Sequence, residues 1–176
     1  MANETDTHDV VDGIVDDVFD LYPGIEVNGL PITGRVMRLA RYLEALREQW
    51  LGEFGLTVPD FDVLATMRRT AGNAAINVRE LQRSMMLSSG GTTKRLDRLE
   101  HAGLIERLPD PNDRRGVLIR LTPAGIELID QAIPAITAHE NEVVGNAIPS
   151  TRRRDQVADG LRRLLLDRER AESEDL

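Results

Sequence analysis

The stretch that decides the fold is LSSGGTTKRLDRLEHAGLIERLPDPNDRRGVLIRLTPAG, residues 87–125. It predicts a helix over 88–102, which opens on a serine that can cap it and closes before a glycine. Two short β-capable runs, 104–108 and 117–121, flank a polar, turn-rich loop and predict a β-hairpin. A threonine followed by proline then opens another helix at Thr122. This stretch therefore predicts the order helix, hairpin, helix.

Helical periodicity, caps and breakers extend this order in both directions. An asparagine followed three residues later by glutamate forms a capping-box pattern at Asn77. Proline inside the helix after Thr122 predicts a kink at Pro134. The other helices are expected at 9–21, 32–54, 57–69, 78–85 and 151–168, with a frayed tail over 170–176.

Two helices joined by a short turn at 86–87, followed by a hairpin with a basic loop, form a winged helix-turn-helix plan. The expected fold class is mainly α with a small β-hairpin wing (α+β). The chain contains 41% hydrophobic and 30% charged residues, which is a globular composition. Aromatic residues make up only 3%, so the core must consist mainly of aliphatic side chains.

Composition also excludes several kinds of chemistry. The chain has no cysteine, which removes disulfides, thiol catalysis and cysteine-ligated zinc. Its three histidines are far apart and form no ligand pattern. No nucleophile–base signature or phosphate-cradling loop is found, so neither an enzyme nor a bound cofactor is expected. No apolar run approaches a membrane span, and a cytoplasmic protein is expected.

The net charge of −8 conceals a basic segment. Residues 1–30 contain eight acids and no Lys or Arg, whereas residues 79–120 contain nine bases and six acids. A local basic patch, rather than the total charge, decides whether a surface attracts phosphates. The segment 79–120 is therefore the candidate nucleic-acid surface.

The helix predicted over 88–102 is the candidate recognition helix. Its small and hydroxyl-bearing residues would let its N-terminus approach DNA, and its amides and cations would bind phosphates or base edges. The alternative is an ordinary surface helix with a good cap. The expected DNA-binding residues are Ser88, Ser89, Gly91, Thr92, Thr93, Lys94 and Arg98.

The hairpin loop is the second candidate DNA contact, through Asp113, Arg114 and Arg115. An arginine at a hairpin tip can enter the minor groove, where the potential is strongly negative. Asp113 would hold an arginine extended through a charge-assisted hydrogen bond. A solvated charged turn is the alternative interpretation.

Four linked motifs in this chain closely resemble the MarR family of bacterial regulators. They are 87–100, 103–107, 110–116 and 121–125. The resemblance implies a homodimer that binds double-stranded DNA at a pseudo-palindromic operator, with half-sites about 34–36 Å apart. It also implies three regions: an extra N-terminal helix and a long dimer-core helix (1–54), a DNA-binding lobe (55–121) and C-terminal dimerisation helices (122–176).

The chain further resembles the urate-responsive HucR/PecS branch of that family, which carries an extra N-terminal helix. That branch binds a small anionic effector through one acidic residue and two arginines. The matching positions are Asp62, Arg79 and Arg95. A tryptophan of the branch's first helix aligns near Val18, so the ligand is left open among urate, another purine and a carboxylate. The alternative for the three residues is a structural ion-pair network.

The resemblance implies a transcriptional repressor whose DNA binding is relieved by the effector. A MarR-type regulator without an effector is the second interpretation. A winged-helix module for protein–protein contact is a third, although the basic helix and the arginine-bearing loop argue against it.

Overall fold

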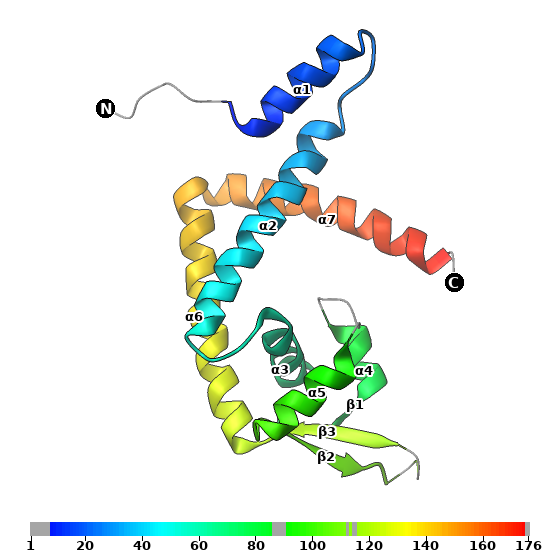
Figure 1. Ribbon diagram of the computed structural model, residues 1–176, viewed down its shortest axis with the longest axis vertical. Coiled ribbons are helices and arrows are strands. Elements are labelled where there is room, and N and C mark those ends of the chain that lie inside the picture. Colours follow the sequence, from blue (N-terminus) through cyan, green and yellow to red (C-terminus); the bar gives the residue numbers. More distant parts are fainter. Residues whose placement is uncertain (1–7, 86–90, 112, 114–115, 175–176) are drawn as a thin grey trace. The chain divides into compact units, whose positions relative to one another are not determined.

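The computed structural model describes residues 8–85, 91–111, 113 and 116–174. The chain divides into two compact units, Met1–Val58 and Pro59–Leu176. Figure 1 shows the elements. The helices are α1 (Val10–Leu21), α2 (Leu30–Gly52), α3 (Val58–Ala71), α4 (Val78–Ser84), α5 (Thr92–His101), α6 (Pro123–Ala147) and α7 (Thr151–Glu174). The strands are β1 (Ile76–Asn77), β2 (Ile105–Pro109) and β3 (Val117–Leu121).

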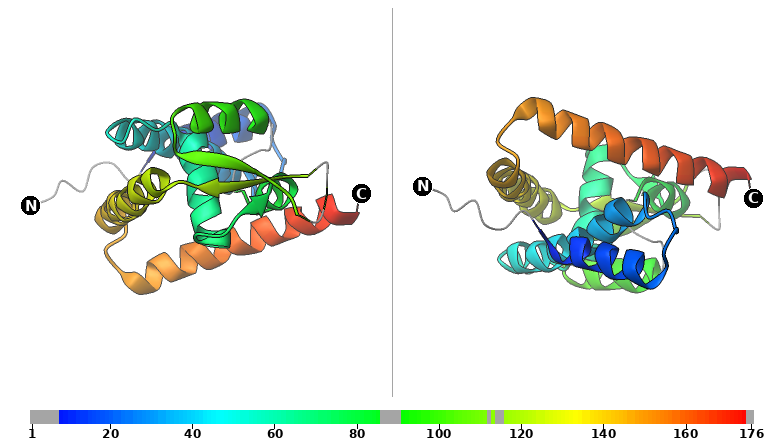
Figure 2. Two further views of the ribbon diagram at one scale, coloured as in Figure 1. Left: turned by 90° about the horizontal axis from the view of Figure 1, so that it is seen from below. Right: turned by 90° about the horizontal axis from the view of Figure 1, so that it is seen from above.

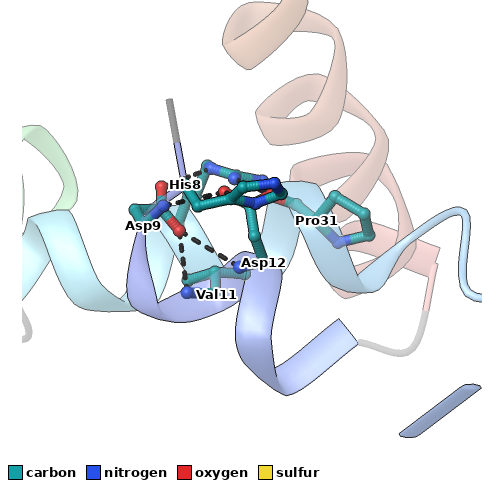
Figure 3. A network of polar contacts seen from close by, with 6 residues as sticks. His8, Asp9, Val11, Asp12 and Pro31 are labelled. Atoms are coloured by element: carbon teal, nitrogen blue, oxygen red, sulfur yellow. Dashed lines mark hydrogen bonds and ion pairs between the residues drawn. The ribbon is translucent and has the colours of Figure 1, made fainter. Parts of the chain in front are cut away.

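In the first unit, a capping box starts α1 and also ties it to α2 (Figure 3). The Asp9 carboxylate accepts hydrogen bonds from the amides of Val11 and Asp12, and Asp12 accepts one from the Asp9 amide. Arg35 of α2 donates to both carboxylates, at 2.8 Å and 2.6 Å. This hydrogen bond from Arg35 is the main cause that lowers the pKa of Asp12. Beside it, the buried Val11 packs against Gly34, where a side chain would crowd it.

In the second unit, the predicted hairpin is confirmed and gains a third strand. β2 and β3 pair antiparallel, with Ile105 opposite Leu121 and Leu108 opposite Leu118. The two-residue strand β1 pairs with the other edge of β3, which gives the sheet order β1-β3-β2. Aliphatic side chains from this sheet and from α3, α4 and α5 are buried; they are Val63, Leu64, Met67, Ile76, Leu81, Leu96, Leu99, Ile105, Ile119 and Leu121.

Two helix boundaries differ from the sequence prediction by more than two residues. α5 begins at Thr92, with Gly91 as its N-cap at φ 74°, a left-handed conformation that glycine adopts without strain. Ser88, the predicted cap, lies outside the described residues. α7 continues to Glu174 instead of ending near residue 168, and intrahelical pairs such as Arg162 with Asp159 stabilise its middle part. α6 runs through Pro134, and α7 follows it at an angle (Figure 2).

The start of α6 is fastened to the corner between α5 and β2. Thr122 caps α6 by accepting from the Gly125 amide at 3.1 Å, and its hydroxyl donates to the Gly103 carbonyl at 2.6 Å. The Thr122 amide donates to the Leu104 carbonyl at 3.0 Å. A Cβ at Gly125 would overlap that carbonyl oxygen and lie 2.9 Å from its carbon. The two backbone segments therefore approach as closely as only glycine allows.

A second connection joins α3 to α6. The Arg68 guanidinium donates to both carboxylate oxygens of Asp130, at 2.7 and 2.8 Å, and to the Asn73 side chain at 2.8 Å. This bidentate pair lowers the pKa of Asp130 and raises that of Arg68. The lobe is thus fixed to α6 at two places.

Replacing Gly125 with alanine should destabilise this unit strongly, because the new methyl group meets backbone that cannot move aside as a side chain can. We expect a loss of about 2–3 kcal/mol in the free energy of unfolding, measured by urea denaturation. Gly13→Ala is the matched control: its site in α1 is open, and alanine should stabilise it by about 0.5–1 kcal/mol. Equal stability of both variants would contradict the close approach.

The Arg68–Asp130 pair should make stability depend on acid pH. Because the pKa of Asp130 is below its ordinary 3.8, the ionised pair stabilises the fold above that value, and the contribution is lost as the pH falls through the lowered pKa. Asp130→Asn should therefore be less stable than wild type at neutral pH and equal to it at the acid end of the titration. Chemical denaturation between pH 7 and pH 2 measures this, with Asp20→Asn in α1 as a charge-matched control. A constant difference across the range would rule out the pair as the cause.

Candidate nucleic-acid interface

The helices α4 and α5 form the helix-turn-helix of the second unit. The Asn77 side chain caps α4 by accepting from the Glu80 amide at 2.8 Å, as the capping-box pattern predicts. Leu81, on the inner face of α4, is completely buried. At the other end of α4, Arg69 of α3 donates to the Ser84 carbonyl at 2.7 Å. α4 is therefore fixed at both ends, and α5 follows it.

α5 buries one face and exposes the other. Leu96 and Leu99 are each only 2% exposed and lie in the core. Gly91, Thr93, Lys94 and Arg98, from the predicted DNA-binding set, are exposed on the helix or at its cap.

Three other residues of the predicted DNA-binding set are not among the exposed residues that the structure describes. Thr92 is only 2% exposed and packs inward at the first position of α5. Ser88 and Ser89 lie outside the described residues. The exposed polar surface of α5 is therefore built from its cap and from the residues after Thr92.

The β2–β3 hairpin is the wing, and in Figure 1 it projects beside α4 and α5. Arg107 of β2 joins it to α5 by donating to Asp97 at 2.6 Å and to Glu100. These contacts, led by the hydrogen bond to Asp97, raise the pKa of Arg107. Across the hairpin, Arg120 bonds its directly opposite neighbour Glu106 at 2.9 Å. Ion pairs thus link the wing to α5.

The wing loop is closed at its base by backbone hydrogen bonds. The Asp110 amide donates to the Gly116 carbonyl at 3.1 Å, and the Gly116 amide donates to the Asp113 carbonyl at 2.8 Å. A Cβ at Gly116 would lie 2.9 Å from the Asp110 Cβ, so the closure needs glycine. Asp113 is exposed, while Arg114 and Arg115 lie outside the described residues.

Arg98 has a partner that the sequence did not reveal. Its Nη2 donates to Oδ1 of Asp60, in the first turn of α3. Asp60 is 4% exposed, whereas the Arg98 side chain is 55% exposed. The ion pair thus reaches from the protein interior to the exposed face of α5.

The three predicted effector residues lie in different surroundings. Asp62 in α3 is 7% exposed, Arg95 in α5 is half-buried, and Arg79 in α4 is exposed. Arg79 lines a hollow of about 500 Å³ between α4 and the base of the wing. Among the described residues its lining is Asn77, Val78, Arg79, Arg83, Asp110, Asp113, Gly116 and Val117, which includes neither Asp62 nor Arg95.

Four charged residues whose ion pairs connect these elements were not singled out from the sequence: Asp60, Asp97, Glu100 and Arg107. Each is an ordinary charged residue by type, and its partner is 7 to 38 positions away on another element. One usable signal was present. Asp60 lies within the stretch Val58–Met67, where apolar residues are too closely spaced to leave one solvent-facing side, so its carboxylate needed a buried partner.

Comparison with known proteins identifies this arrangement. A family model described as the MarR family matches residues 56–117. The HTH-type transcriptional regulator PecS of Dickeya dadantii is 30% identical over 122 residues, which are 69% of this chain and 74% of that protein. The multiple antibiotic resistance protein MarR of Salmonella typhimurium is 36% identical over 102 residues, 58% of this chain and 69% of that protein.

Solved structures agree with the sequence comparison. The crystal structure of a mutant MarR from Escherichia coli complexed with operator DNA has a TM-score of 0.67 and 26% identity, covering 80% of this chain and 99% of that one. In the part of this chain that the structure describes, no helix combines the length and apolar character that crossing a lipid bilayer demands. The chain belongs to the MarR family of helix-turn-helix, DNA-binding transcriptional regulators, and it is not an enzyme.

Proposed function

We propose that this regulator is a homodimeric repressor that binds a pseudo-palindromic operator and is released by a small anionic metabolite. The observation that carries the DNA-binding part is the exposed face of α5, with Thr93, Lys94 and Arg98, on a helix whose other face is buried. α5 would lie in the major groove with its N-terminal residues at the base edges. The wing, with Asp113, Arg114 and Arg115, would contact the adjacent minor groove.

The distribution of charge supports this orientation. The segment 79–120 carries a local balance of +3 in a chain of net charge −8, so the remaining 134 residues carry −11. DNA would be attracted to the lobe and repelled by the rest of the chain. The acidic N-terminal region would in this way oppose non-specific binding in other orientations.

The homodimer is supported by an apolar stripe on α7. Val157, Leu161 and Leu164 follow helical spacing and remain 46–49% exposed. A soluble monomer rarely leaves such a stripe in water, because each buried aliphatic side chain contributes roughly 1.5–3 kcal/mol. The same stripe on a second copy would cover it. Two lobes would then read two half-sites, as a symmetric operator requires.

The effector part rests on the chemistry of Asp62, Arg79 and Arg95. Two guanidinium groups suit a carboxylate or another oxyanion through bidentate hydrogen bonds, and urate, another purine or a small carboxylate offers such an acceptor. The effector would favour a dimer whose lobe spacing does not match DNA. Effector and operator then weaken each other's binding by the same factor.

A regulator without an effector is the second candidate, and one observation favours it. Asp62 is almost fully buried, and the hollow beside Arg79 is lined by the wing base rather than by Asp62 and Arg95. The three residues would then serve the packing of the lobe. The two candidates differ only in whether a small anion releases the DNA.

The DNA-binding proposal is tested by a mobility shift with the DNA upstream of the protein's own gene. Specific shifts should weaken steeply as salt rises, because phosphate contacts release counterions. Footprinting should protect two half-sites about one helical turn apart.

Arg115→Ala should cost about 1–3 kcal/mol of operator affinity if this arginine makes a groove contact.

A duplex carrying a single half-site is the control, and it should bind far more weakly than the complete operator. Equal affinity for operator and random DNA would refute sequence-specific regulation. Equal affinity for one and two half-sites would refute the dimer alone.

The effector proposal is tested by comparing two neighbouring arginines of α4. Ligands that raise the melting temperature are first found among urate, other purines and polycarboxylates, since a ligand bound only to the folded state stabilises it. Arg79→Ala should then abolish ligand-induced release of the operator. Arg83→Ala, one turn further along α4 and lining the same hollow, should release DNA as wild type does. Unchanged release in Arg79→Ala would favour the effector-free candidate.

A further inference from the structure

We propose that Asp60 is a positioning residue for DNA binding, which holds Arg98 so that the outer part of its guanidinium meets a DNA phosphate. The inference rests on the proposed placement of α5 in the major groove. It assigns a role to a buried residue of α3 that would not itself touch DNA.

The geometry of the pair separates its two ends. Asp60 is the third residue of α3 and is 4% exposed, so its carboxylate lies in the interior. Arg98 Nη2 donates to Asp60 Oδ1, yet 55% of the Arg98 side chain is exposed. The Arg98 side chain is therefore held by a buried carboxylate and yet remains more than half exposed to solvent.

The chemistry of the two groups makes this arrangement persistent. A buried carboxylate without a cation is costly, so Asp60 keeps Arg98 in place. The first turn of α3 also favours a negative charge at Asp60, because the amides at a helix N-terminus carry partial positive charge. The guanidinium is planar, with five N–H donors in a fixed fork, so fixing one edge also fixes the direction of the others.

The position of Arg98 on α5 gives the pair its consequence for DNA. Arg98 lies one turn after Lys94, and both are exposed. On the wing side, Arg107 holds Asp97 and Glu100. α5 is thus tied by charge to β2 on one flank and to α3 on the other, which restrains rotation about its own axis. An arginine ordered before binding loses less entropy when it meets a phosphate.

The test measures operator affinity and its dependence on salt for Asp60→Asn, Arg98→Gln and the double variant. Asp60→Asn should weaken binding on the order of tenfold, the factor for one charge-assisted hydrogen bond. Log affinity falls as log salt rises, and in both single variants this fall should be less steep, by about 0.9, the value for one phosphate contact. The double variant should bind no more weakly than Arg98→Gln alone, because both changes remove the same contact.

Glu80→Gln is the matched control, since it removes one exposed acid from the neighbouring helix α4. It should leave affinity unchanged or slightly raise it, because a negative charge near DNA is lost. Asp60→Asn would do the same if Asp60 acted only through its charge. Tighter or equal binding by Asp60→Asn, with the salt slope unchanged, overturns the inference.

Circular dichroism and thermal melting show whether each variant folds. If Asp60→Asn unfolds, Arg98→Lys decides the matter: it keeps a cation beside Asp60 but lacks the planar fork. It should melt as wild type does and bind the operator several-fold more weakly, and wild-type affinity would overturn the inference. If Arg98→Gln leaves affinity unchanged while wild type binds its operator specifically, this inference fails and the proposed function stands. If wild type shows no specific binding, both fail.

Discussion

The close approach of two backbone segments at Leu104 and Gly125 is the constraint on which the second unit depends. The Leu104 carbonyl accepts the Thr122 amide, and the missing Cβ of Gly125 leaves room for that carbonyl. The corner after α5 and the first turn of α6 are consequently one rigid piece. The Arg68–Asp130 pair repeats the connection from α3. The start of α6 therefore sets the orientation of this lobe, including that of α5.

Arginine side chains supply three further connections among the described residues of the lobe. Arg107 joins the wing to α5, Arg98 joins α5 to α3, and Arg69 joins α3 to the end of α4. The same residue type thus supplies both the internal fastening and the charge that DNA attracts.

Local signals predicted most of the fold. Asn77 and Thr122 were recognisable as caps, and each accepts the expected backbone amide. The hairpin followed from two apolar runs around a turn-rich loop. β1 could not be predicted, since two residues carry no periodicity and pair only because β3 is nearby. The start of α5 was placed at Ser88 because the sequence offers a good cap there, whereas the glycine cap at Gly91 depends on backbone conformation.

The candidate site was harder to predict from the sequence, because it depends on residues that only folding brings together. The exposed residues of α5 followed from periodicity, whereas the buried Thr92 did not, because threonine suits either side of a helix start. Ion pairs such as Asp60 with Arg98 join residues 38 positions apart, and no local pattern encodes that distance. The grouping of Asp62, Arg79 and Arg95 came from resemblance alone, and it is the part of the site for which the described contacts offer least support.

The length of α6 has a mechanical consequence. Its 25 residues form a rod about 38 Å long, anchored at one end by Gly125 against the lobe. A tilt of about 5° at the anchored end moves the far end by about 3 Å. Equally, a displacement of the far end by about 3 Å tilts the anchored end by about 5°. A shift of a few ångströms where α6 meets α7 would thereby rotate the lobe that carries α5. In the proposed homodimer, such a lever would let small repacking far from DNA change the distance between the two DNA-binding lobes.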